Sequence, residues 1–438
     1  MVGPVVAHLT SLSHHRTHVY PQNPHSPSLA GLHVAYAAFE PLPNHKGSGT
    51  RITQMVRALV HAGARVTLLS LASKQANPAA ALLQLPGLIH RPLPIAEPNL
   101  LARALKFRDA VAQALEALQP DVVHFRGIFE GRACLDHAYH RGIPSIFEAH
   151  GLPSIELAYH YPALADAPAL LGKLRRQEAD CLARADQVIT QSQHTLAFLQ
   201  AHGRGARPAH VIPNGADPQR FAPQLGPRAL APSSGPQPLQ VLYVGTLTAW
   251  QGLGELLAAT ARARKALRQR GDQTTDLHLK VVGPGRRGWL KALARRAQRL
   301  GLTEALTIQD PTDHGELPAL VQSAQLCVAP LRDDPRNRHQ GCSPIKVFEY
   351  MAAGKATIVS DLPCVREICS ERTSRLVRPG HPKDLADTLL DLAHDPEQRA
   401  RLGSAARQYV LDTATWDHRH LALQTLYGVL LDRARAAR

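Results

Sequence analysis

Segments that read as strands alternate along this chain with segments of helical periodicity, and this alternation restricts the possible folds more than any other feature. In the stretch RITQMVRALVHAGARVTLLSL, residues 51–71, apolar residues recur from Ile52 at the i, i+3, i+4, i+7 and i+8 positions of a helix. Gly63 is expected to end that helix, and residues 65–71 predict a buried strand. Strands that alternate with helices favour right-handed crossovers and a parallel, doubly wound sheet.

The alternation runs through the chain twice. In the first half, further strands are expected at LHVAYAAFE, DVVHF, IPSIFEAH and DQVIT, residues 32–40, 121–125, 143–150 and 186–190. In the second half they are expected at LQVLYVG, LHLKVVG, ALTIQ, AQLCVAP and KATIVS, residues 239–245, 277–283, 305–309, 324–330 and 355–360. Two halves of this kind face each other across a cleft, and ligands of such sheets bind at the carboxyl ends of the strands.

We therefore predict an α/β fold with two Rossmann-like, doubly wound parallel-sheet domains that face a central cleft. Residues 31–220 would form the first domain and residues 239–415 the second. Pro, Gly and Ser accumulate between them, in residues 221–238, which predicts a linker. Residues 1–30 are rich in His, Pro and Ser and lack periodicity, so we expect a flexible N-terminal extension.

Charge, apolar content and cysteine spacing indicate which partners and which location to expect. The formal net charge of +15 favours an anionic partner, but Lys and Arg are spread along the chain and no aromatic stacking platform accompanies them, so no nucleic acid is expected. No apolar run is long enough to span a membrane, which predicts a cytoplasmic protein. The six cysteines form no C-x-x-C pair and read as reduced core thiols.

Two basic helical segments, residues 100–115 and 170–186, leave a second location open. They allow peripheral association with an anionic membrane at its inner face, although a solvated outer helix face is the commoner explanation for such segments.

The stretch GCSPIKVFEYMAAGKATIVSD, residues 341–361, carries the strongest chemical signal. Ser343 as N-cap and Pro344 as first residue predict a helix whose free N–H groups suit an anion, and Gly354 would end it. Lys346 in the first turn is unfavourable unless a ligand or a carboxylate compensates it. A Lys346–Glu349 pair at i, i+3 is one such explanation. The alternative is a sugar nucleotide, whose diphosphate binds the helix start while its hydroxyls donate to Glu349.

The motifs also resemble a known family. This stretch, together with DVVHF, AHG at 149–151, VIPNGADPQRF at 211–221, VLYVG at 241–245 and VVGPG at 281–285, is similar to the glycosyltransferases of family 4. The resemblance runs from about residue 31 to the C-terminus. It implies the GT-B architecture, in which residues 31–220 form the acceptor domain and residues 239–415 form the donor nucleotide-sugar domain. It also implies that residues 416–438 pack back as a helix on the N-terminal domain.

The resemblance also implies an activity, the transfer of a sugar from a nucleotide diphosphate sugar to an acceptor hydroxyl. The family mostly retains configuration and usually needs no metal and no cofactor. The expected partners are the nucleotide-sugar donor and a sugar or lipid-linked acceptor, and the expected setting is glycan, glycolipid or envelope polysaccharide synthesis. Two alternatives stay open: a nucleotide-sugar 2-epimerase of the same architecture, and a catalytically inactive sugar-nucleotide-binding subunit.

In the second half, the resemblance makes Glu349 the second glutamate of the family's paired-glutamate motif, which holds the donor's ribose. Gly341 stands where the first glutamate is usual, which indicates a subgroup with a Ser-Pro-x-Lys-x-Phe-Glu-Tyr-Met pattern. Thr246 and Gln251 stand where the family has an Arg and a Lys that contact the diphosphate. Lys346 and the helix start are candidates to replace that charge, as are Arg332, Arg336 and Arg338.

In the first half, HKGSGTRITQ at residues 45–54 matches the family's glycine-rich loop, with Thr50 as the expected helix cap, although a simple tight turn is an alternative. His150 matches the cleft histidine that neighbours the transferred sugar, and Glu148 is a weaker candidate on the same strand end. The expected catalytic residues are His150, Lys346 and Glu349, and no metal ligand is expected. The expected donor-binding residues are Gly47, Ser48, Gly49, Gly245, Thr246, Gln251, Gly283, Gly285, Ser343, Pro344, Ile345 and Glu349.

Overall fold

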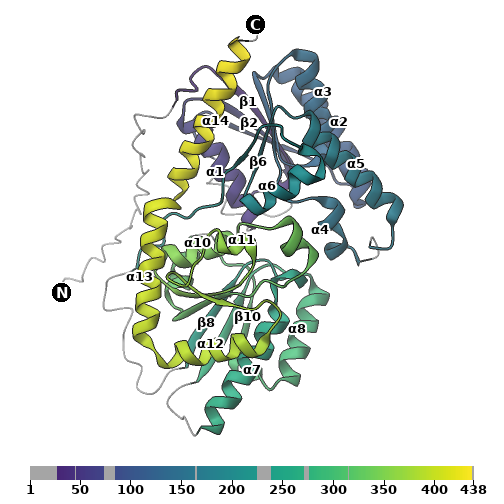
Figure 1. Ribbon diagram of the computed structural model, residues 1–438. Coiled ribbons are helices and arrows are strands. Elements are labelled where there is room, and N and C mark those ends of the chain that lie inside the picture. Colours follow the sequence, from purple (N-terminus) through teal and green to yellow (C-terminus); the bar gives the residue numbers. More distant parts are fainter. Residues whose placement is uncertain are drawn as a thin grey trace, which may run out of the picture.

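The chain folds into two α/β halves stacked end to end, as the computed structural model in Figure 1 shows. The structure describes residues 27–436 except residue 45 and segments 74–83, 163–164, 224–237, 271–275 and 314. Most of the expected N-terminal extension and most of the expected linker therefore lie outside the described residues. Each half contains one parallel sheet with helices on both faces. The predicted α/β fold with two Rossmann-like domains is confirmed.

The N-terminal sheet has seven parallel strands. Their spatial order is β3 (Leu88–Leu93), β2 (Arg65–Ala72), β1 (His33–Leu42), β4 (Val122–Phe125), β5 (Ser145–Glu148), β6 (Gln187–Thr190) and β7 (Ala209–Val211). The helices of this half are α1 (Gly47–His61), α2 (Leu100–Leu118), α3 (Ile128–Arg141), α4 (Pro153–His160), α5 (Pro168–Arg184) and α6 (Gln193–Leu199). The order reverses between β1 and β4, which is where such sheets bind ligands.

The C-terminal sheet has six parallel strands. Their order is β10 (Leu306–Gln309), β9 (Leu277–Val282), β8 (Leu239–Val244), β11 (Leu326–Ala329), β12 (Ala356–Ser360) and β13 (Arg375–Val377). The helices that follow these strands are α7 (Leu253–Gln269), α8 (Arg287–Arg299), α9 (Leu317–Gln322), α10 (Ile345–Ala352), α11 (Pro363–Arg366), α12 (Pro382–His394), α13 (Pro396–Thr413) and α14 (Trp416–Ala436).

Three strands escaped the sequence analysis, and all three lie at sheet edges. They are β3, β7 and β13. An edge strand is covered less completely than a central one, so it does not need a continuous apolar run. In β3 the residues alternate between half-buried and exposed until Leu93, and His90, Arg91 and Pro92 interrupt the apolar pattern. By contrast, the central strands β4, β5, β6, β11 and β12 are buried along their whole length.

Of the stripe predicted from Ile52 to Val60, all residues but the half-buried Val60 lie in the core. Ile52, Met55, Val56 and Leu59 are fully buried on α1, and they pack in one cluster with β1, β2 and the C-terminal helix. Gly63 follows the helix with φ +96°, which suits a residue without Cβ. Leu29, inside the segment expected to be flexible, is also buried there, and its N–H donates to the Ala62 carbonyl at 2.8 Å.

The chain passes between the two halves at two adjacent places. The first crossing follows β7, and by Ala216 and Phe221 the chain already packs in a core cluster of the C-terminal half. The second crossing joins α13, which lies on α10, to α14, which lies on α1 (yellow in Figure 1). The two crossings are hydrogen-bonded to each other, since the N–H of Ala216 donates to the Ala414 carbonyl and the N–H of Trp416 donates to the Ala216 carbonyl.

Side chains hold α14 onto the N-terminal half. Leu423 and Tyr427 are fully buried. The Gln424 amide donates to the Ala58 carbonyl at 2.7 Å, and the Tyr427 hydroxyl lies 2.9 Å from His124 Nδ1 on β4. The last helix is therefore part of the N-terminal core although it follows the C-terminal half in sequence.

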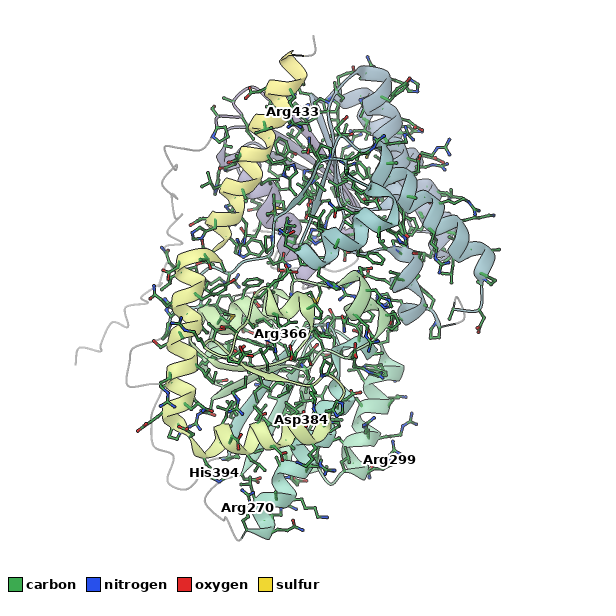
Figure 2. All side chains as sticks on the ribbon, viewed as in Figure 1. Arg270, Arg299, Arg366, Asp384, His394 and Arg433 are labelled. Atoms are coloured by element: carbon green, nitrogen blue, oxygen red, sulfur yellow. The ribbon has the colours of Figure 1, made fainter. Side chains whose placement is uncertain are left out.

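Basic side chains are distributed over both halves. Figure 2 shows Arg270, Arg299, Arg366 and Arg433 at separate places along the molecule. In the part of the chain that the structure describes, none of the helices combines the length and the apolar content that a membrane crossing requires.

Packing of α14 can be tested by truncating one buried side chain. Leu423→Ala should lower the free energy of unfolding by about 2–5 kcal/mol, because it removes apolar contact and leaves a cavity. Val429 on the same helix is 44% exposed, so Val429→Ala should change stability by less than about 0.5 kcal/mol. Urea denaturation followed by circular dichroism measures both, and equal effects would contradict this packing.

Candidate active site

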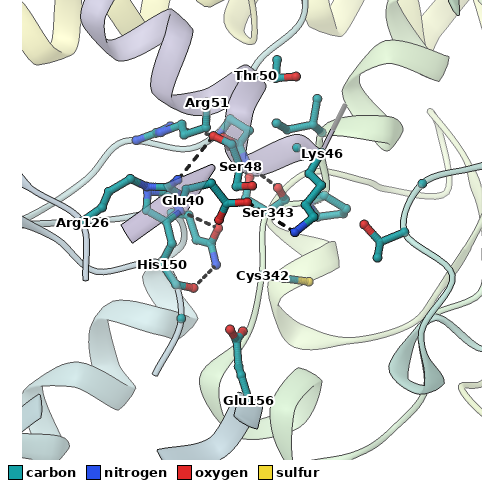
Figure 3. Close-up of a pocket in the computed structure, with 18 of the residues that line it drawn as sticks. Glu40, Lys46, Ser48, Thr50, Arg51, Arg126, His150, Glu156, Cys342 and Ser343 are labelled. Carbon is teal, nitrogen blue, oxygen red and sulfur yellow. Dashed lines mark hydrogen bonds and ion pairs between the residues drawn. The ribbon is translucent and has the colours of Figure 1, made fainter. Parts of the chain in front are cut away.

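A cleft of about 480 Å³ lies between the two halves. Figure 3 shows Glu40, Arg126 and His150 of the N-terminal half close to Ser343 of the C-terminal half, with Glu156 pointing into the space. Most of the residues predicted from the sequence line this cleft. They are Gly47, Ser48, His150, Gly245, Thr246, Gln251, Ser343, Pro344, Ile345, Lys346 and Glu349.

The start of α10 lies at the cleft, but its cap differs from the prediction. The helix begins at Ile345, and its N-cap residue is Pro344, which provides no side-chain cap. The prediction of Ser343 as N-cap is wrong, because its hydroxyl accepts a hydrogen bond from the Asn214 N–H at 3.1 Å instead. The Asn214 amide also donates to the Ser343 carbonyl at 2.5 Å. Ser343 therefore ties the helix start to the first interdomain crossing.

Lys346 reaches from α10 to the end of β8. Its ammonium donates to the Tyr243 hydroxyl and to Gln251 Oε1, each at 2.8 Å, and it lies 4.0 Å from the centre of the Tyr243 ring. Gly245 has φ +140°, and a Cβ there would lie 2.7 Å from Lys346 Nζ, so this position requires glycine. Burial lowers the pKa of Lys346 to about 7, although Cys342 and Glu349 act in the opposite direction.

Glu349 lines the cleft one turn further along α10. Burial raises the pKa of its carboxyl to about 7, opposed by Arg220 and Lys346. Among the described residues, no hydrogen bond and no ion pair joins Glu349 to Lys346, whose ammonium is directed to Tyr243 and Gln251. An internal Lys346–Glu349 pair therefore does not explain why the two charges are present.

The departure at position 341 has a steric cause. Gly341 has φ +78°, and a Cβ at this residue would lie 2.9 Å from His194 Cδ2 and 3.1 Å from Thr195 Oγ1 on α6. A glutamate side chain would be strained here and would start inside a packed contact. Glycine at position 341 thus lets α6 of the N-terminal half pack closely against the C-terminal half.

Of the three arginines considered as replacement cations, Arg336 alone is among the residues that line the cleft. It pairs with Glu156 across the domain boundary, with Nη2 3.1 Å from Oε1. Arg332 pairs with Glu255 and Arg338 with Asp333. The cation nearest the start of α10 is therefore Lys346.

The glycine-rich loop forms the opposite wall. Helix α1 begins at Gly47, directly after Lys46, so Thr50 lies inside the first turn and its prediction as the helix cap is wrong. Gly47 and Ser48 line the cleft. Gly49 does not, and a Cβ there would lie 2.5 Å from Asn44 Oδ1 in the preceding loop.

Gly283 and Gly285 were expected to bind the donor, but neither is among the residues that line the cleft. Gly283 has φ +147°, and a Cβ there would lie 2.0 Å from the Gly245 carbonyl oxygen. Because Gly283 has no side chain, the end of β9 can approach the end of β8. This approach shapes the cleft indirectly.

His150 follows β5 and is held between two side chains. Its Nε2 lies 2.6 Å from Glu148 Oε1, and its Nδ1 lies 3.0 Å from Gln191 Oε1. Burial lowers the pKa of His150 to about 4, although Glu148 acts to raise it. Contacts at both ring nitrogens fix the plane of the imidazole, so the ring presents one orientation to the cleft.

Glu148, the weaker candidate of the sequence analysis, lies beneath His150 and is fully buried. Arg51 Nε donates to its Oε1 at 2.9 Å, the Tyr36 hydroxyl donates to its Oε2 at 2.5 Å, and His124 Nε2 lies 3.3 Å from Oε2. Burial alone would raise the pKa of Glu148, but Arg51 and the neighbouring histidines hold it well below its ordinary value. The residue is therefore a buried anion with a complete set of donors.

Several cleft residues were missed by sequence reasoning. They are Glu40, Arg51, Arg126, Glu130, Glu156, Asn214 and Cys342. A signal existed for Arg51, because a charged residue beside the apolar stripe of α1 implies a buried partner. Its partner Glu148 is 97 residues away, so the sequence alone did not identify the pair.

Direct contacts hold the two halves together around the cleft. Gln340 accepts a hydrogen bond from the Leu152 N–H at 3.0 Å and donates to Glu156 Oε1 at 2.9 Å. Glu367 accepts from the N–H groups of Gln193 and His194 at the start of α6, both at 2.7 Å. Within the described ranges, no group of three His, Cys, Asp or Glu side chains is placed to hold a metal ion.

The buried anion can be tested through stability. Glu148→Gln should lower the free energy of unfolding by about 3–5 kcal/mol, because it leaves Arg51 buried without its counter-charge. In the wild type this stabilisation is present above the unfolded glutamate pKa of about 4.3 and is lost as pH falls through the lower folded value. Chemical denaturation over this pH range measures it.

A surface pair supplies the control. Asp391 is 59% exposed and lies 3.2 Å from Arg375. Asp391→Asn should cost less than about 1 kcal/mol at any pH. An equal loss in the two variants would show that Glu148 behaves as an ordinary surface carboxylate.

Comparisons with known proteins cover both halves of the chain. The model of Glycosyltransferase Family 4 matches residues 45–220, and the model of Glycosyl transferases group 1 matches residues 238–395. A D-inositol 3-phosphate glycosyltransferase of Salinispora arenicola is 25% identical over 296 residues, which cover 66% of this chain and 64% of that protein. The chain therefore spans somewhat less than two thirds of that relative's length.

Solved structures share the fold. Sucrose-phosphate synthase from Thermosynechococcus elongatus superposes with a TM-score of 0.76 at 20% identity, covering 92% of this chain and all of that one. Anabaena HepE in complex with UDP-glucose superposes with a TM-score of 0.71 at 16% identity, covering 91% of this chain and all of that one. With the two family models matching the two halves of the chain in order, the protein belongs to glycosyltransferase family 4.

Proposed function

We propose that the protein transfers a glycosyl group from a nucleotide diphosphate sugar to an acceptor hydroxyl. The observation that carries this proposal is the cleft itself. On one wall, the start of α10 carries the half-buried ammonium of Lys346 and the carboxyl of Glu349, to which no described residue makes a hydrogen bond or an ion pair. On the other wall lie a glycine-rich helix start and an oriented imidazole.

The donor's diphosphate would lie at the start of α10. The free N–H groups of the first turn and the Lys346 ammonium both favour an anion there. The Lys346 ammonium donates hydrogen bonds to Tyr243 and Gln251. These two contacts hold it at the place where the phosphate charge would lie. Glu349 would accept hydrogen bonds from hydroxyls of the ribose. UDP-glucose is the first donor to test, because the structurally similar Anabaena protein is described in complex with it.

The chemical task of the site is to stabilise charge on the leaving group. When the glycosyl bond breaks, negative charge develops on the diphosphate, and fixed dipoles and an ammonium in a partly buried site stabilise it. We assign His150 to the neighbourhood of the transferred sugar. Transfer would proceed with retention, by attack on the face from which the diphosphate leaves, with a diphosphate oxygen taking the acceptor's proton. The proposal needs no metal and no covalent nucleophile.

The expected setting is the synthesis of a glycan, a glycolipid or an envelope polysaccharide. A lipid-linked acceptor would bring the protein to the inner face of a membrane. Cosedimentation with vesicles that contain anionic lipid would detect such association, and equal recovery with neutral vesicles would contradict an electrostatic attachment.

A second candidate function is sugar-nucleotide binding without transfer. Thr246 and Gln251 in place of the usual cations favour it, since the site then has one ammonium, Lys346, beside the expected diphosphate position. An epimerase of the same architecture would instead convert the donor without any acceptor. Transfer, epimerisation and binding without turnover leave different molecules in the reaction mixture.

One set of incubations separates them. Thermal shifts with UDP-, GDP- and ADP-sugars would identify the donor, and mass spectrometry of mixtures with and without acceptors would identify the product. A glycosylated acceptor supports transfer, an epimer formed without acceptor supports the isomerase, and binding without consumption supports the inactive subunit. No stabilisation by any sugar nucleotide at millimolar concentration would overturn the proposal.

Two single substitutions should have different kinetic effects. Glu349→Ala should weaken donor binding by about 10²-fold, roughly 2.7 kcal/mol, because the hydroxyls lose their acceptor. His150→Ala should lower turnover while donor affinity changes little, because the imidazole neighbours the transferred sugar. Donor titrations and initial rates measure both, and each variant is the control for the other. Unchanged affinity and rate in Glu349→Ala would remove this residue from the donor site.

Lys346 predicts a pH dependence of donor binding. With a pKa of about 7 in the free protein, the amine is uncharged above that pH, and a bound diphosphate raises its pKa. Binding at higher pH therefore takes up a proton, and affinity for UDP-glucose should fall by up to about tenfold per pH unit between about pH 7.5 and 9. Calorimetry in buffers of different ionisation enthalpy measures the uptake.

The matching control is a lysine outside the cleft. Lys346→Met should bind weakly and without this pH dependence. Lys383→Met removes an exposed amine from α12 and should keep the wild-type profile. A pH-independent wild type would show that Lys346 does not carry the charge that the donor meets.

A further inference from the structure

Glu130 on the N-terminal wall is a fully buried carboxylate that lines the cleft and uses only one of its oxygens. It is the third residue of α3. Its Oε1 accepts hydrogen bonds from the N–H groups of Gly127 at 2.7 Å and Phe39 at 3.3 Å. Its Oε2 is buried and has no hydrogen-bond partner in the described chain.

Capping of α3 does not account for the second oxygen. A glutamine at this position caps a helix equally well, because one oxygen suffices. A buried acceptor without a donor costs stability, and the cost is larger for a charged group. Burial raises the pKa of Glu130 to about 7 even though several backbone N–H groups act to lower it. The wall therefore holds an acceptor for which the described residues supply no donor.

Two aromatic side chains line the cleft on the same wall as this carboxylate. Phe39 and Phe129 line the same wall, with ring centroids 5.0 Å apart and planes at 65°. Sugar rings and cyclic polyols have apolar C–H faces that pack on aromatic rings, and hydroxyl edges that donate to carboxylates. The two rings and the free oxygen together match such a molecule.

The charges on this wall are balanced. Lys46 lies 3.4 Å from Glu40, and the buried Arg51 lies 2.9 Å from Glu148. Arg126 Nε lies 3.9 Å from the same Glu148 carboxylate. Arg51 and Arg126 share the Glu148 carboxylate, so Glu130 is the third acidic group that balances the three cations when it is ionised. A phosphorylated acceptor would meet no surplus positive charge among the described residues here.

We propose that Phe39, Phe129 and Glu130 form the acceptor subsite, and that it takes an uncharged sugar or cyclic polyol whose hydroxyl donates to Glu130 Oε2. This inference rests on the proposed glycosyl transfer and adds the acceptor class to it. It assigns Glu130 a binding role, and no bond is formed to its carboxylate.

Two variants test the subsite by different routes. Glu130→Gln keeps one oxygen to accept from Gly127 and Phe39. It replaces Oε2 by an NH2 group, which cannot accept a hydrogen bond from the acceptor's hydroxyl. Gly127→Ala keeps the carboxylate, but its Cβ would lie 3.0 Å from Oε2 and crowd the approach. We expect each to raise KM for the acceptor about tenfold or more, with donor KM and the slow hydrolysis of donor by water unchanged. Glu397→Gln, an exposed glutamate in the first turn of α13, is the control.

The wild-type protein is assayed with the donor selected by the nucleotide screen. Glucose, mannose, galactose and myo-inositol are compared with glucose 6-phosphate and myo-inositol 3-phosphate. Transfer to an uncharged acceptor, with the expected KM changes in both variants, supports the subsite. If Glu130→Gln fails to fold, as judged by its melting temperature, the KM change in Gly127→Ala decides.

Two results overturn the subsite alone while donor turnover persists: preference for the phosphate esters, or unchanged acceptor KM in the folded variants. Failure of the wild-type protein to bind or consume any donor overturns the proposed function, and with it this inference. Donor hydrolysis in water separates the two cases, because it requires the donor site and no acceptor.

Discussion

The fold of the N-terminal half depends on one buried negative charge, the carboxylate of Glu148. It is contacted by Tyr36 from β1, Arg51 from α1 and His124 from β4, and it contacts His150 after its own strand. Because an isolated charge in a protein interior is very costly, these elements must assemble together to satisfy it. The orientation of His150 in the cleft is therefore a result of electrostatic balance within the core.

The two walls of the cleft differ in their electrostatics. On the C-terminal wall, both Lys346 and Glu349 have pKa values of about 7, so their ionisation responds to a bound ligand. On the N-terminal wall, the cations already face carboxylates. An anion gains most from the C-terminal wall, whereas an uncharged, hydroxyl-rich molecule suits the N-terminal one. This asymmetry matches a reaction between a charged donor and a neutral acceptor.

The sequence predicted the two-domain fold and the family because both depend on local patterns repeated along the chain. It also named most of the C-terminal wall, whose residues lie close together in sequence, although their roles stay predictions. It failed where tertiary partners decided the outcome. Ser343 was predicted to cap α10, but its hydroxyl accepts a hydrogen bond from the N–H of Asn214, which is 129 residues away. Glu130 was not singled out, because nothing local shows that one of its oxygens is buried without a donor among the described residues.

The paired crossings between the halves have a mechanical consequence. Ala216 is hydrogen-bonded to both Ala414 and Trp416, so the two covalent connections behave as one strap at one side of the molecule. Any rotation of one half against the other must turn about this strap. Arg336 and Glu156 meet across the boundary at a distance from this strap, so such a rotation would pull their ion pair apart.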